Sequence, residues 1–146
     1  MNATGARAER RARWYYRLRG YRVLEANTRP GGVEVDLVVR RGRSLVFCEV
    51  KAKLGERFGD PVEMVGWEKQ QRLRRAAEAW LAAHPEASDW EVRFDVVAVT
   101  PRGVRCVANA FYDSAGTWRS VVRGTDSGCV VRRDRPRALV VGARPP

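Results

Sequence analysis

The stretch VEVDLVVRRGRSLVFCEVK, residues 33–51, decides the fold. Its first part, Val33–Arg40, alternates apolar side chains with other residues, as a half-buried strand does. Its second part, Ser44–Lys51, is apolar on both faces as far as Glu49, which is typical of a central, buried strand. Arg41-Gly42 separates the two parts and indicates a hairpin. The stretch therefore predicts two neighbouring antiparallel strands.

Three charged residues interrupt this apolar hairpin: Asp36 in the first strand, and Glu49 and Lys51 at the end of the second. Burying such groups is costly unless they are paired or bind a metal ion. A hairpin loop with an even number of residues places Asp36 and Glu49 on the same face, diagonal or directly opposite, with Cβ atoms within about 8 Å. A loop of three residues places them on opposite faces. A shared site thus requires an even loop.

Two carboxylates held together favour a hard divalent cation, Mg²⁺ or Mn²⁺, which takes oxygen ligands. Such an ion polarises a phosphodiester and lowers the pKa of a bound water, and a neighbouring lysine orients that water or stabilises developing charge. Asp36, Glu49 and Lys51 supply these parts. From the residues alone, a structural salt bridge between Glu49 and Lys51 is the competing interpretation.

The rest of the chain predicts an α/β domain. A helix is expected over Gly5–Arg19, capped by Thr4, and a second from Trp67 until Pro85 stops it. Further strands are expected at Tyr21–Asn27, Glu91–Thr100 and Val104–Ala108. The order α-β-β-β-α-β-β predicts a mixed sheet flanked by helices, with residues 1–112 as the domain. Residues 113–146 are expected to form a basic tail, mobile or loosely docked, rather than an added hairpin.

Three more polar residues fall beside the predicted site. Lys69 and Gln70 continue the apolar stripe of the second helix, so they face the acids unless the helix start frays into solvent. Glu9 lies at the edge of the first helix's apolar stripe, where it could reach the same cation. Its alternative partner is Arg13, one helical turn away.

The charge balance indicates a polyanionic partner. Lys and Arg total 28 against 17 Asp and Glu, a net charge of +11. Such a surplus favours the binding of nucleic acid through its phosphates, and a solvated basic surface without a partner is the alternative. No apolar run resembles a membrane span or a signal peptide, so a cytoplasmic location and no membrane partner are expected. Three scattered cysteines and one histidine argue against a zinc site or a disulfide framework and favour free thiols.

An ordered set of motifs resembles the YraN-like family over about residues 5–112. The motifs are Gly20-Tyr21-Arg22-Val23-Leu24, Asn27-Thr28-Arg29, Val33–Val38, Leu45–Lys51, Phe58-Gly59-Asp60-Pro61, Lys69-Gln70 and Arg93–Val99. Val33 departs from the glycine that the family usually has there. The family in turn resembles Holliday-junction resolvases and other PD-(D/E)XK nucleases, whose restriction-endonuclease-like core is an αβββαβ unit.

The resemblance implies catalytic roles for Asp36, Glu49 and Lys51, with Glu9 as a helix-borne acid and Glu34 beside the site as a further metal ligand. It implies a Mg²⁺-dependent endonuclease that acts on the phosphodiesters of branched or duplex DNA and selects its substrate by structure, as resolvases do. A homodimer is expected from this analogy only. The alternatives are a non-catalytic nucleic-acid-binding protein that retains a nuclease fold, and an interaction module for an acidic partner.

Overall fold

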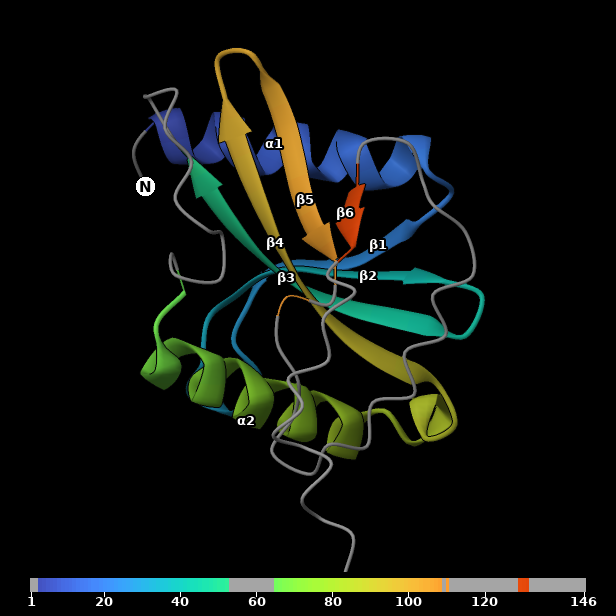
Figure 1. The fold of residues 1–146 in the computed structure, drawn as a ribbon. Coiled ribbons are helices and arrows are strands. Elements are labelled where there is room, and N and C mark those ends of the chain that lie inside the picture. Colours follow the sequence, from blue (N-terminus) through green and yellow to red (C-terminus); the bar gives the residue numbers. More distant parts are fainter. Residues whose placement is uncertain (1–2, 53–64, 109, 111–128, 132–146) are drawn as a thin grey trace, which may run out of the picture.

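A single mixed sheet, sandwiched between two helices, forms the framework of the computed structural model, which describes residues 3–52, 65–108, 110 and 129–131 (Figure 1). Each predicted helix and strand is found, with bounds that differ by at most two residues. The elements are α1 (Ala3–Leu18), β1 (Arg22–Thr28), β2 (Val35–Arg41), β3 (Ser44–Ala52), α2 (Trp67–Ala83), β4 (Glu91–Thr100), β5 (Gly103–Ala108) and β6 (Cys129–Val131), with short 3-10 turns at Pro30–Gly32 and Pro85–Ala87.

The strands lie in sequence order, β1-β2-β3-β4-β5-β6. The β3–β4 and β5–β6 pairs are parallel and the other pairs are antiparallel. The connection from β3 to β4 contains α2, which packs on one face of the sheet while α1 packs on the other (Figure 1). The α/β class and the αβββαβ order of a restriction-endonuclease-like core are thereby confirmed.

The β2–β3 hairpin has the even loop that a shared site requires. Arg41 pairs with Ser44, so the loop is Gly42-Arg43, one residue later than the sequence suggested. The last registered pair is Leu37 with Cys48. One step further along this ladder, Asp36 lies directly opposite Glu49.

Strand β3 is central because both of its faces are covered. Val46 and Cys48 belong to the apolar cluster under α1, and Leu45 and Phe47 to the cluster under α2. The ring of Phe47 meets that of Trp80, from α2, edge to face at 5.9 Å. The two-sided apolar pattern of residues 45–48 therefore reflects burial on both sides.

Helix α1 ends in a glycine cap. The Tyr21 N–H donates to the Tyr16 carbonyl and the Gly20 N–H to the Arg17 carbonyl, while Gly20 has φ +83°. This is the Schellman arrangement, completed by an edge contact of 5.3 Å between the Tyr16 and Tyr21 rings. The start of the helix was predicted wrongly: because α1 begins at Ala3, Thr4 lies inside its first turn and does not precede it as a cap.

Strand β6 was not predicted. It lies within residues 113–146 and pairs in parallel with β5, so it is not a hairpin. The rest of that tail, and the Phe58-Gly59-Asp60-Pro61 motif, lie outside the described residues. In the described part of the chain, no helix combines the length and apolar character needed to cross a membrane.

Candidate functional site

Glu49, at the end of the central strand, is buried, with 5% of its surface exposed. The Lys51 ammonium lies 3.4 Å from its Oε1, and the Lys69 ammonium of α2 lies 3.5 Å from its Oε2. Both distances exceed the 2.7–2.9 Å of a charge-assisted hydrogen bond. Among the described residues, Oε2 has no hydrogen-bond partner. Glu49 is therefore neutralised by charge without being fully hydrogen-bonded.

The Arg93–Asp95 pair shows how this chain builds a structural ion pair. Asp95 is 1% exposed and receives two hydrogen bonds from Arg93, of 2.8 Å to Oδ1 and 2.9 Å to Oδ2. The Tyr16 hydroxyl donates a third, of 2.8 Å, to Oδ2. Its oxygens are thus occupied, whereas those of Glu49 retain capacity for another ligand.

Asp36 lies opposite Glu49 on β2, partly buried. One of its oxygens accepts the Val50 backbone N–H at 2.7 Å, which fixes the carboxylate against β3. Burial and, after it, the negative charge of Glu49 raise the pKa of Asp36 from 3.8 to about 7, against the opposing effect of the Val50 N–H. Two carboxylates thus repel each other in a partly dehydrated setting.

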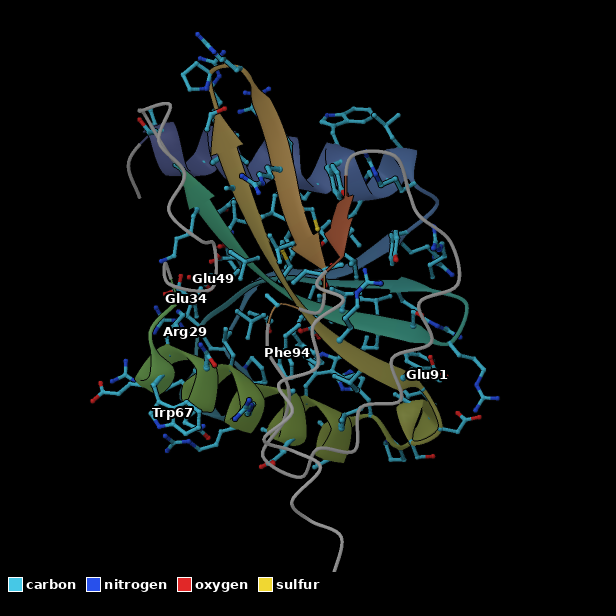
Figure 2. All side chains as sticks on the ribbon, viewed as in Figure 1. Arg29, Glu34, Glu49, Trp67, Glu91 and Phe94 are labelled. Atoms are coloured by element: carbon cyan, nitrogen blue, oxygen red, sulfur yellow. The ribbon has the colours of Figure 1, made fainter. Side chains whose placement is uncertain are left out.

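The beginning of α2 contributes the Lys69 ammonium to the site. The position of Lys69 on the apolar stripe of the helix predicted that it would face the acids. Gln70 has another partner: its side-chain amide donates to the Val65 carbonyl at 2.9 Å, which holds the segment that precedes α2. Figure 2 shows Glu49 at the same edge of the molecule as Trp67, the first residue of α2. Among the predicted pair, only Lys69 contacts an acid.

Glu9 and Glu34 have partners of their own. Glu9, on α1, accepts a hydrogen bond of 2.9 Å from the Asn27 side chain, and Arg13 is not its partner among the described contacts. Its charge nevertheless contributes to raising the pKa of Asp36. Glu34 forms an exposed ion pair of 3.7 Å with Arg29, at the same edge as Glu49 in Figure 2. Asn27 belongs to one of the motifs of the resemblance, but the sequence assigned it no role; in the structure its backbone has a φ of +50°.

The site therefore centres on two acids and two lysines. Within the described ranges, no three His, Cys, Asp or Glu side chains gather closely enough to hold an ion. The four-acid set implied by the resemblance is not brought together, because Glu9 and Glu34 are drawn to Asn27 and Arg29. Asp36 and Glu49 still fit a hard divalent cation: both offer oxygen, they repel each other, and Oε2 of Glu49 has no hydrogen bond.

Comparison with known proteins agrees with the resemblance found in the sequence. The model of "Uncharacterised protein family UPF0102" matches residues 8–99. A UPF0102 protein of Rhodopseudomonas palustris (strain BisB18) is 41% identical over 112 residues, which is 77% of this chain and 82% of the relative. One from Frankia casuarinae is 51% identical over 81 residues, 56% of this chain and 68% of the relative. One from Nitratidesulfovibrio vulgaris (strain DP4) is 38% identical over 113 residues, which is 77% of this chain and 84% of the relative. On the family match and these relatives, this chain belongs to the uncharacterised protein family UPF0102, the YraN-like family.

Proposed function

We propose that this protein is a metal-dependent endonuclease that hydrolyses DNA phosphodiesters at the Asp36–Glu49–Lys51 site. The observation that supports this most is the state of Glu49, a buried carboxylate between two ammonium groups that leaves one oxygen without a hydrogen bond. A purely structural pair in the same sheet, Arg93–Asp95, has no such deficit. The acid pair is therefore arranged for a ligand.

Asp36 and Glu49 would hold Mg²⁺ or Mn²⁺, with the remaining ligands coming from water and substrate. When bound, such an ion supplies Lewis-acid polarisation of the phosphate and a water of lowered pKa. Lys51, about one-third exposed, reaches the solvent side of Glu49, where its ammonium can stabilise charge that develops on the phosphate. Lys69 balances the second oxygen of Glu49 and limits the cost of burying it.

A nucleic acid is the substrate that the charge favours, and the resemblance to resolvases indicates DNA. The net charge of +11 is carried almost entirely by arginine, whose planar guanidinium binds phosphate oxygens in pairs. The described fold contains neither a helix-turn-helix nor a zinc finger, so contacts would be made to phosphates and to DNA shape rather than to base edges. We therefore propose a structure-selective enzyme, resembling resolvases in its preference for branched DNA.

A second candidate is a non-catalytic nucleic-acid-binding protein that retains a nuclease fold. The observation in its favour is that Lys51 and Lys69 together already neutralise Glu49, and that only two acids converge in the described part of the chain. This candidate predicts metal-independent DNA binding and no cleavage.

Cleavage assays on branched, flapped and linear duplex DNA distinguish the two candidates. With Mg²⁺ or Mn²⁺, we expect the wild-type protein to nick branched or flapped DNA. Asp36→Asn and Lys51→Ala should abolish nicking while DNA binding persists in EDTA. Gln70→Ala is the matched control, because Gln70 bonds the Val65 carbonyl and not the acids, so it should keep nicking. Equal nicking by Asp36→Asn would identify a contaminating nuclease and refute the proposal.

A further inference from the structure

A cavity of about 360 Å³ opens between the start of α1 and the ends of β3 and β4, on the face of the sheet opposite to Glu49 and Lys51. Figure 1 shows these three segments meeting at one edge of the fold, next to the β4–β5 turn. The residues that line the cavity are Ala3, Thr4, Arg7, Ala8, Arg11, Ala52, Val99, Thr100 and Pro101. Most of its wall is apolar, and the charged groups on it are both arginines.

One of the two arginines is fixed in place. Arg11 is partly buried and donates from Nη1 to the Thr100 carbonyl at 2.7 Å. A guanidinium carries five N–H donors, so this bond leaves others for a ligand. Arg7, one helical turn earlier on the same helix, is exposed at the cavity wall. Two guanidiniums beside small apolar side chains suit a ligand with a phosphate at one end and an apolar ring or sugar at the other.

The cavity and the proposed catalytic site lie at the same end of β3, on opposite faces of the sheet, and two elements connect them. Ala52, on its wall, directly follows Lys51 on β3, and Ala8 directly precedes Glu9, whose charge acts on Asp36. Strand alternation places Ala52 on the α1 face and Lys51 on the opposite face of the same strand end. A ligand in the cavity would thus lie at the end of β3, across the strand from the proposed catalytic lysine, and the substrate would pass around this end of the sheet to reach both.

We propose that this cavity binds one unpaired nucleotide of the DNA substrate, with its phosphate on Arg7 and Arg11 and its sugar and base against the apolar wall. The proposal rests on the proposed function and specifies its substrate class. Because the volume is at the small end of ligand pockets, it accommodates a single splayed nucleotide and excludes a double helix. The substrate is therefore DNA with a single-stranded arm next to the cut, such as a flap.

Binding measured in EDTA tests this inference without any need for cleavage. Fluorescence anisotropy at 0.1 M salt would compare a flapped DNA with a blunt duplex of the same length. We expect Arg7→Gln to weaken flap binding about fivefold, because that is the contribution of one contact to a single-strand phosphate at this salt concentration. The affinity for the duplex should change far less. Thr4→Trp, which fills the cavity mouth from an exposed position without altering charge, should reproduce that selective loss.

Arg17→Gln is the matched control, since Arg17 is exposed on the same helix, carries the same charge and does not line the cavity. It should affect flap and duplex equally. Two outcomes would overturn the inference: Arg7→Gln losing affinity in the same proportion on both DNAs, or Thr4→Trp, confirmed as folded by circular dichroism, binding the flap as the wild type does. Neither outcome depends on catalysis. If the nuclease proposal alone were wrong, the protein would still bind the flap selectively and would not cleave it.

Discussion

Replacing Asp36 by asparagine should stabilise the metal-free protein by an amount that grows as the pH rises from about 4 to about 7. Asp36 has its pKa raised from 3.8 to about 7 by burial and by Glu49. Below about pH 4 the group is protonated in both the folded and the unfolded chain and has no effect. Between about pH 4 and pH 7 only the folded chain keeps the proton, so folding stability falls as pH rises. Above pH 7 the full cost of ionising Asp36 in the folded chain is present.

The size of the effect follows from the shift. One pKa unit corresponds to about 1.4 kcal/mol, so the full shift corresponds to about 4 kcal/mol. Because Asp36 keeps part of its surface in water, which screens the repulsion, we expect Asp36→Asn to gain about 2 kcal/mol at pH 8. Asparagine retains an oxygen that can accept the Val50 N–H, so the hydrogen bond at this position is conserved.

Urea unfolding in EDTA, followed by tryptophan fluorescence at pH 4 and pH 8, measures this difference. Asp89→Asn is the matched control, because Asp89 is an exposed acid paired with Arg43 and loses the same charge. It should change stability by less than about 1 kcal/mol at either pH. Mg²⁺ at pH 8 should stabilise the wild type and not Asp36→Asn. If Asp36→Asn were no more stable than the wild type at pH 8, or gained as much stability at pH 4, the conclusion that the ionised Asp36 beside Glu49 destabilises the fold would be refuted.

Two further predictions concern the framework, and both are measured by urea unfolding at pH 7. Gly20→Ala should cost about 1 kcal/mol, because Gly20 has φ +83° at the end of α1 and a Cβ is strained there; unchanged stability would contradict the cap assignment. Arg93→Gln should cost about 3–5 kcal/mol, because it leaves the carboxylate of Asp95 buried without its bidentate partner, whereas Arg43→Gln in the exposed pair should cost less than about 1 kcal/mol. Similar losses for the two arginine variants would contradict this assignment.

The features that were predictable from the sequence depend on periodicity. Alternation in residues 33–40 and the two-sided apolar run that follows imply a hairpin against a central strand, and the register found in the structure opposes Asp36 to Glu49. Helical spacing likewise placed Lys69 toward the acids, where it contacts Glu49. In each case a single repeat, of two or 3.6 residues, determines which face a side chain occupies.

Features that depend on a particular partner were not predictable. The start of α1 two residues before the expected Gly5 depends on local backbone geometry, and Thr4 does not reveal it. Glu9 is held by Asn27, an interaction between residues 18 positions apart that no spacing rule specifies. Strand β6 has three residues, too few to show a period, and its place is set by the free edge of β5. Arg74 of α2 is buried, and its guanidinium lies 5.7 Å from the Trp67 ring. Its burial also depends on tertiary packing, which the spacing of residues does not reveal.

The two kinds of buried ion pair in this sheet are the reason for proposing a site, rather than a structural bridge, at the acid pair. Where the chain needs only to bury a carboxylate, at Asp95, it surrounds that group with short, well-directed hydrogen bonds. At Glu49 it instead places two flexible ammonium groups at 3.4 and 3.5 Å and a second acid opposite. With both acids ionised, the two lysines balance the two carboxylates, so an added divalent cation would leave an excess positive charge. The phosphates of a nucleic acid are the groups that would neutralise this excess, which is why cation and substrate are expected to bind together.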